Sequence, residues 1–212
     1  MKMKALLFDV DGTLLSEEPL VNYMMPIVYE ELAKKLGINR EKARKIFLQE
    51  VQRRWGRDEW FSWNFFFTYF GLDLKYEDFI RENPHLLRVY PEVTNVLQQL
   101  KSRVKLAIVT SGPAYQRLKL EVTGLLNYFQ VVITRDESGV VKPDPKAFIP
   151  AIEVLGVNPS ETAVVGDSLE WDILGAKSLG MKGVWINRRG EKGYHFPDFE
   201  FPNLLGLLEV MK

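Results

Sequence analysis

Short apolar runs alternate with amphipathic helical patterns over most of this 212-residue sequence. The apolar runs cover residues 5–10, 104–110, 131–134, 162–165 and 183–187. Helical patterns follow at residues 91–101, 114–123, 145–155 and 169–179. Strands that alternate with helices of about ten residues usually form a parallel sheet with crossover helices. The sequence therefore predicts an α/β fold, with a Rossmann-like parallel sheet flanked by helices.

The alternation is interrupted between residues 16 and 88. Apolar residues at helical spacing from Val21 to Leu36 indicate one long helix, which Gly37 can end. A second helical pattern covers residues 40–55, an aromatic block follows at 60–67, and a short helix is expected at 76–82. We therefore expect residues 1–15 and 89–212 to form an α/β core domain. Residues 16–88 are expected to form a helical domain inserted after the first strand.

Composition excludes several functional classes. The formal net charge is zero, which gives no overall attraction to nucleic acid or to an anionic membrane. The chain has no cysteine and two histidines, His85 and His195, so thiolate metal sites and cysteine nucleophiles are excluded. No window approaches the roughly 18 apolar residues of a membrane span. We expect a cytoplasmic protein that binds neither nucleic acid nor membrane, with His195 at its surface. No feature of the sequence indicates an oligomeric state.

Four polar clusters follow predicted strands, at the sheet edge where parallel α/β proteins bind ligands. The clusters are Asp9-x-Asp11-Gly12-Thr13, Thr110-Ser111-Gly112, Lys142-Pro143, and Gly166-Asp167 with Asp172. Two carboxylates that straddle a strand end can converge on one metal ion and one substrate. Together the clusters supply a carboxylate nucleophile, oxygen ligands for Mg²⁺, a cation and a proton donor. Phosphoryl transfer requires this combination.

Each cluster taken alone also has a structural explanation. An Asp-Gly pair is a common turn sequence. Thr110-Ser111 can cap the following helix, and Lys142 can be a solvated loop lysine. Asp167 with Glu170 resembles a capping box. The functional interpretation therefore depends on all four clusters occurring together and in this order.

The four clusters resemble the ordered motifs of the haloacid dehalogenase superfamily, from residue 9 to residue 172. The helical insertion is similar to that superfamily's C1-type cap, and the phosphoglycolate phosphatase-like branch is the most similar. The resemblance implies that Asp9 attacks phosphorus and becomes an aspartyl phosphate, while Asp11 acts first as a general acid and then as a general base. Thr110 and Lys142 would hold the phosphoryl group. The implied ligands of Mg²⁺ are Asp9, Asp11, Asp167 and Asp172.

The expected substrate is a small phosphorylated metabolite. Donors to its phosphoryl group are expected in the loops of the first two motifs, at Gly12, Thr13, Ser111 and Gly112. A local density of arginine and tryptophan in the insertion suggests substrate contacts at Arg54, Arg57 and Trp63. Aromatic side chains at helical spacing, however, more often pack in a core.

Asp11 favours a phosphatase over the namesake 2-haloacid dehalogenases, which lack this second aspartate and magnesium. A phosphomutase of the β-phosphoglucomutase type has the same four motifs, so it stays open as an alternative. A catalytically idle member that acts as a binding protein is a further alternative. The intact motif positions favour an enzyme over that last possibility.

Overall fold

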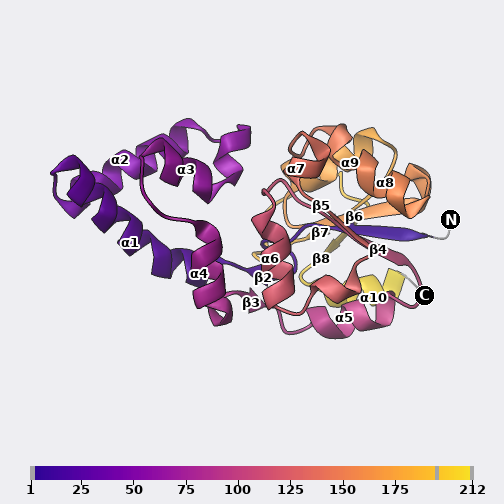
Figure 1. The fold of residues 1–212 in the computed structure, drawn as a ribbon. Helices are drawn as coiled ribbons and strands as arrows, with labels where there is room; N and C mark the ends of the chain where they lie inside the picture. The colour runs from indigo at the N-terminus through magenta and orange to yellow at the C-terminus, as the bar shows by residue number, and fades with distance from the viewer. Residues whose placement is uncertain (1–2, 194–195, 211–212) are drawn as a thin grey trace. The chain divides into compact units, whose positions relative to one another are not determined.

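The computed structural model describes residues 3–193 and 196–210, so the expectation for His195 lies outside the described residues. The chain divides into two compact units (Figure 1). Unit 1 comprises Met1–Ser16 and Val89–Lys212, and unit 2 comprises Glu17–Arg88. The two-stranded sheet of β2 (Leu15–Ser16) and β3 (Arg88–Val89) lies where the chain passes from one unit to the other. The assignment of unit 2 as a C1-type cap stays a prediction.

Unit 1 is built on a parallel sheet with the strand order β5-β4-β1-β6-β7-β8 in the described part of the chain. Its central strand β1 pairs with β4 on one side and β6 on the other, with Leu7 opposite Ala107 and Val164. Every residue of β1 is fully buried, as expected for a parallel strand covered on both faces. The predicted Rossmann-like sheet is confirmed. The strands are β1 (Ala5–Phe8), β4 (Lys105–Val109), β5 (Val131–Ile133), β6 (Thr162–Gly166), β7 (Lys182–Ile186) and β8 (Phe199–Phe201).

Helices cover both faces of this sheet. Figure 1 shows α7, α8 and α9 on one face and α5 and α10 on the other. Ala151 and Leu155 of α8 pack with Leu7 and Val109 in the core. The helices of unit 1 are α5 (Val93–Leu100), α6 (Tyr115–Val122), α7 (Arg135–Ser138), α8 (Ile149–Leu155), α9 (Gly175–Ser178) and α10 (Leu207–Val210).

Two predicted helices differ in detail from the structure. Residues 145–155 form a 3-10 turn, Pro145–Ala147, followed by α8. Pro150 occupies the first turn of α8, the part of a helix where its missing N–H costs no hydrogen bond. Residues 169–179 form a π-helix, Leu169–Leu174, before α9. The sequence pattern did not predict the short elements α7, β8 and α10.

Unit 2 is helical, with α1 (Glu18–Leu36), α2 (Arg40–Arg53), α3 (Trp63–Tyr69) and α4 (Tyr76–Glu82). α1 ends at Gly37, which has a left-handed φ of 64°. Asn39 caps α2 by accepting a hydrogen bond from the N–H of Lys42 at 2.9 Å. The buried rings of Phe47 and Phe66, with centroids 5.8 Å apart, form part of the unit's core. No helix within residues 3–193 and 196–210 is long and apolar enough to cross a membrane.

Candidate active site

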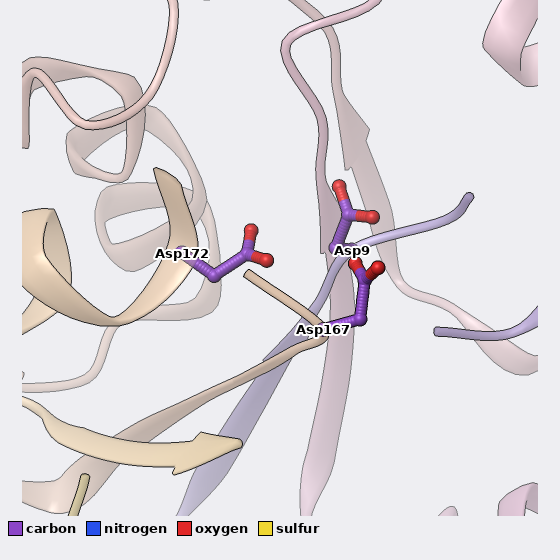
Figure 2. A group of neighbouring side chains, drawn as sticks. All are labelled: Asp9, Asp167 and Asp172. Atoms are coloured by element: carbon purple, nitrogen blue, oxygen red, sulfur yellow. The ribbon is translucent and has the colours of Figure 1, made fainter. Parts of the chain in front are cut away.

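Three carboxylates gather at the carboxyl edge of the sheet. Figure 2 shows that they come from three segments: Asp9 follows β1, Asp167 follows β6, and Asp172 lies in the π-helix. Each side chain offers an oxygen within 4.8 Å of the others. Carboxylate oxygens are the ligands that hard divalent cations such as Mg²⁺ prefer. The donor set therefore fits a divalent metal ion.

Two glycines make room for these carboxylates. Gly12 has a φ of 82°, and a Cβ built there would lie 2.2 Å from Oδ2 of Asp167. A Cβ on Gly166 would lie 2.2 Å from the carboxylate of Asp172. The π-helix begins beside this glycine, and Oδ2 of Asp172 accepts the N–H of Ser168 at 3.0 Å. Any larger residue at either glycine would displace an acidic side chain of the cluster.

Lys142 is the cation of this cluster. Its Nζ donates to Oδ1 of Asp9 at 2.5 Å and to Oδ1 of Asp172 at 2.6 Å. The side chain is only 3% exposed, so the interpretation of Lys142 as a solvated loop lysine is wrong. Its backbone N–H donates to Oγ of Ser111, which fixes the loop against the second motif. Because a buried ammonium is stable only when it is paired, Lys142 holds the two carboxylates in place.

The pKa values of the cluster are shifted by burial and by the repulsion between neighbouring carboxylates. Burial raises the pKa of Asp9 well above its usual value; Asp172 and Asp167 add to the effect, and Lys142 opposes it. Burial and the nearby Asp172 raise the pKa of Asp167 to about 7. Burial disfavours the charged form of Lys142, but Asp172 and Asp9 outweigh it and hold its pKa above the usual value. A divalent cation would relieve this repulsion between carboxylates, which is a second reason why the residues fit a metal.

Asp11 has a different set of neighbours. Its carboxylate accepts from Nε2 of Gln116 at 2.7 Å and from Nζ of Lys119, which is 2.9 Å from both oxygens. The sequence analysis missed these two α6 residues. A signal for them exists, because the buried face of α6 consists of Tyr115, Gln116, Lys119 and Leu120. Two polar residues on the inward face of an amphipathic helix indicate a polar partner inside.

The loops of the first two motifs are largely buried. Thr110 and Ser111 are each 5% exposed, and Oγ1 of Thr110 accepts the N–H of Gly112 at 3.2 Å. Thr13 is fully buried, and its Oγ1 has no hydrogen-bond partner among the described residues. The N–H of Gly12 donates within its own turn, to the carbonyl of Leu15 at 2.8 Å. Their roles as phosphate donors stay predictions.

The structural alternatives for Thr110 and Asp167 are wrong. α6 begins at Tyr115 without a side-chain cap, so Thr110 does not cap it. The π-helix is capped by Ser168, whose Oγ accepts the N–H of Trp171 at 3.1 Å. Both side chains are therefore available for a role at the sheet edge.

Arg188 is a second feature that the sequence analysis missed. Its guanidinium donates to the carbonyls of Gly12 at 3.1 Å and Thr13 at 2.7 Å. It also pairs with Glu92 at 2.7 Å and lies 3.6 Å from the ring centroid of Tyr90. These contacts fix the loop of the first motif. No sequence pattern identifies Arg188, because its partners are backbone carbonyls far away in the chain.

The three candidate residues of unit 2 have different surroundings. Arg54 is 15% exposed, pairs with Glu50 at 2.6 Å and lies 4.7 Å from the ring centroid of Phe65. These contacts give Arg54 a packing role within unit 2. Arg57 is exposed, and Trp63 is partly exposed at the first position of α3. Substrate contacts at all three stay predictions.

The sheet of unit 1 therefore carries acidic and lysine side chains that converge beyond its central strands, at the edge where parallel α/β sheets bind ligands. The model of the haloacid dehalogenase-like hydrolase family matches residues 3–180. The chain belongs to this family and is an enzyme, a hydrolase. The predicted superfamily is confirmed.

Relatives and solved structures match along nearly the whole chain. A glyceraldehyde 3-phosphate phosphatase of Methanopyrus kandleri is 35% identical over 99% of this chain and 97% of its own length. A protein of the same name from Pyrococcus furiosus is 29% identical over 98% of this chain and 94% of its own. The crystal structure of a HAD phosphatase from Thermococcus onnurineus is 53% identical, with a TM-score of 0.97, over 99% of this chain and 98% of that one. All three are phosphatases by name, in agreement with the predicted enzyme class.

Proposed function

We propose that the protein is a Mg²⁺-dependent phosphatase that hydrolyses a small phosphate monoester through an aspartyl phosphate at Asp9. The observation that carries this proposal is the position of the Lys142 ammonium between Asp9 and Asp172, with Asp167 beside them. A carboxylate attacks an anionic phosphate only where fixed positive charge screens the repulsion. This cluster combines a nucleophile, a buried cation and oxygen ligands for a metal.

The metal site would use the acidic residues of the first and fourth motifs. Asp9 and Asp167 would bind Mg²⁺ through carboxylate oxygens, and Asp11 through its backbone carbonyl. Asp172 would bind directly or support the other ligands. The bound ion would supply positive charge beside the phosphoryl oxygens. The raised pKa values of Asp9 and Asp167 support this assignment. They arise first from burial and then from neighbouring carboxylates, and a bound cation would favour the ionised form against both effects.

The first chemical step forms the aspartyl phosphate. A carboxylate oxygen of Asp9 attacks phosphorus, and the bond from phosphorus to the ester oxygen breaks. Asp11 gives its proton to that leaving oxygen, so an alcohol departs. Lys142 and Thr110 hold the phosphoryl oxygens during the transfer. Further donors are proposed at Gly12, Thr13, Ser111 and Gly112.

The second step hydrolyses the intermediate. Asp11, now ionised, takes a proton from water, and the resulting hydroxide attacks phosphorus. The bond between phosphorus and the oxygen of Asp9 breaks, phosphate leaves, and both aspartates return to their starting forms. Each cycle therefore consumes one water molecule and leaves the enzyme unchanged.

The first candidate substrate is glyceraldehyde 3-phosphate or a phosphate ester of similar size. Two relatives that carry this name match the chain along almost its whole length. We propose that unit 1 is the catalytic core domain and that unit 2 is a C1-type cap that selects the substrate. Arg57 and Trp63 are the candidate contacts there, whereas the ion pair of Arg54 with Glu50 favours a packing role for that arginine.

The proposal is tested by hydrolysis of p-nitrophenyl phosphate and glyceraldehyde 3-phosphate, with Mg²⁺ and with a chelator. The wild type is compared with Asp9→Asn and with the control Glu161→Gln. The control also removes one negative charge, but Glu161 precedes the first residue of β6, whereas the carboxylate cluster lies beyond the last residues of the strands. We expect magnesium-dependent release of phosphate that disappears in Asp9→Asn and persists in Glu161→Gln. Turnover that survives in Asp9→Asn would show that another group is the nucleophile.

A further inference from the structure

Two side chains of α6 meet the carboxylate of Asp11. Nζ of Lys119 lies 2.9 Å from both carboxylate oxygens, and Nε2 of Gln116 lies 2.7 Å from Oδ2. Residues three apart on a helix share a face, so one short segment presents both donors. The carboxylate is therefore held by three hydrogen bonds from a single helix.

Burial distinguishes this arrangement from an ordinary surface ion pair. Lys119 is 0% exposed and Gln116 is 5% exposed, whereas the side chain of Asp11 is 28% exposed. Removing an ammonium from water is costly unless it is paired and hydrogen-bonded. An apolar residue at position 119 would pack in α6 without this cost. The buried lysine is thus explained by its contact with Asp11 rather than by helix packing.

The surroundings of Gln116 fix the direction of its amide. A Cβ built on Gly112 would lie 2.4 Å from Nε2 of Gln116, so the glycine makes room for the amide group. Oε1 of Gln116 is buried and has no hydrogen-bond partner among the described residues. Exchanging the two amide atoms would bring Oε1 against the negative carboxylate of Asp11. The amide therefore donates to Asp11 although its oxygen is left unpaired, which normally costs stability.

We propose that Gln116 and Lys119 are positioning residues for Asp11, which hold its carboxylate in one orientation for proton transfer. This inference rests on the proposed function, in which Asp11 is the general acid and then the base. When Asp11 gives its proton to the leaving oxygen, negative charge appears on its carboxylate. The ammonium of Lys119 and the amide of Gln116 are already directed at those oxygens.

The inference predicts a dependence on the leaving group. A 2,4-dinitrophenolate leaves readily as an anion, whereas a phenolate is a poorer leaving group and benefits more from a proton in the transition state. Weakened positioning of Asp11 therefore slows the transfer from phenyl phosphate more than that from 2,4-dinitrophenyl phosphate. A general loss of structure would slow both reactions equally.

The test measures kcat/KM for 2,4-dinitrophenyl, p-nitrophenyl and phenyl phosphate, because this parameter reports the first irreversible step. Wild type is compared with Lys119→Met and Gln116→Leu, which keep similar side-chain volumes. Arg117→Met is the matched control, since Arg117 lies on the same helix with its side chain 48% exposed. We expect Lys119→Met to lower kcat/KM about 10²-fold for phenyl phosphate and far less for the dinitrophenyl ester. Gln116→Leu has the same pattern with a smaller loss, and Arg117→Met behaves as wild type.

Equal losses across the three esters in both variants would overturn the inference and indicate a purely structural role. If Lys119→Met does not fold, as judged by circular dichroism, Gln116→Leu decides the question because it retains the ion pair. Asp9→Asn is measured in the same series. Its inactivity, together with uniform losses in the α6 variants, would leave the proposed function intact and refute only the positioning role. Turnover in Asp9→Asn would refute the proposed function itself.

Discussion

The loop that carries Lys142 and the helix that carries Lys119 both bury an ammonium against aspartates of the first motif. Lys142 is 3% exposed and bridges two carboxylates, those of Asp9 and Asp172. Lys119 is 0% exposed and contacts both oxygens of one carboxylate, that of Asp11. In the first region one cation is shared among acids that also fit a metal ion. In the second, two donors fix a single side chain. We therefore propose different roles for two similarly buried lysines: Lys142 neutralises charge at the carboxylate cluster, and Lys119 orients Asp11.

Replacement of Lys142 by Met is expected to have the largest effect. Asp9 and Asp172 lose their common cation, and the attacking carboxylate loses the charge that screens it from phosphate. We expect kcat/KM to fall about 10³-fold for aryl phosphates, with the same loss for good and poor leaving groups. Steady-state kinetics on the three esters measures this. A loss confined to phenyl phosphate would mean that Lys142, like Lys119, acts on proton transfer to the leaving group, and would contradict its role in neutralising charge.

Substitution of Asp172 by Asn separates the two regions by their metal dependence. The change weakens the support of the carboxylate cluster, so we expect the Mg²⁺ concentration for half-maximal activity to rise about 10- to 100-fold. Lys119→Met leaves this concentration unchanged, because Lys119 contacts the side chain of Asp11. Titration of activity with Mg²⁺, supported by calorimetry without substrate, provides the measurement. If the Mg²⁺ concentration for half-maximal activity rose equally in both variants, Lys119 would also support the metal site, and the two regions would not have separate roles.

Two glycine substitutions each displace a side chain of one region by adding a Cβ atom next to it. In Gly112→Ala the new Cβ meets the amide of Gln116, and in Gly166→Ala it meets the carboxylate of Asp172. We expect Gly112→Ala to lower kcat/KM for phenyl phosphate about tenfold, equivalent to about 1.4 kcal/mol, without changing the magnesium requirement. Gly166→Ala raises the magnesium requirement instead. A raised magnesium requirement in Gly112→Ala, or a loss specific to phenyl phosphate in Gly166→Ala, would contradict the separate roles of the two regions.

Asp198 forms a third cluster with two lysines, which are more exposed than Lys142 and Lys119. Its substitution is expected to have the smallest effect of the changes considered. Burial opposes its ionisation, but hydrogen bonds from Lys177, Lys182 and the N–H of Gly183 outweigh it and lower the pKa to about 2. The ionised form therefore stabilises the fold above about pH 4, and this contribution is lost as the pH falls towards 2. After allowance for solvent around the partly exposed lysines, Asp198→Asn should cost about 1–2 kcal/mol at pH 7. Denaturant unfolding at pH 7 and pH 3 should show the difference from wild type shrinking, with kcat unchanged.

Much of the fold could be predicted because its signals are local. Buried parallel strands appear as continuous apolar runs, and the predicted strand at 162–165 differs from β6 by one residue. Helix ends were predictable where one residue determines them, as at Gly37. The edge strand β8 was missed because only three residues form it and two are exposed. The π-helix was missed because its apolar spacing resembles that of an α-helix.

The candidate site was predictable to a similar degree. Asp9, Lys142 and Asp167 occur in short motifs at strand ends, and the topology of a parallel sheet brings such ends together. Arg188 is recognised only through partners distant in the chain. The inward face of α6 gave a signal for Gln116 and Lys119, because polar residues stand where apolar ones are expected. The sequence could not show the packing contacts of Arg54, which was expected to contact substrate, because its pairing with Glu50 and its ring contacts arise from the folded helices.

In the proposed mechanism Asp9 carries the phosphoryl group during turnover. The most direct measurement is rapid quenching of Asp11→Asn with p-nitrophenyl phosphate and Mg²⁺, followed by peptide mass spectrometry that distinguishes position 9 from position 11. Without its general base, the enzyme should accumulate the intermediate. We expect a phosphoryl group on Asp9 when Mg²⁺ is present and none when Mg²⁺ is removed. Phosphate release without any phosphorylated Asp9, or a phosphoryl group on another residue, would contradict it.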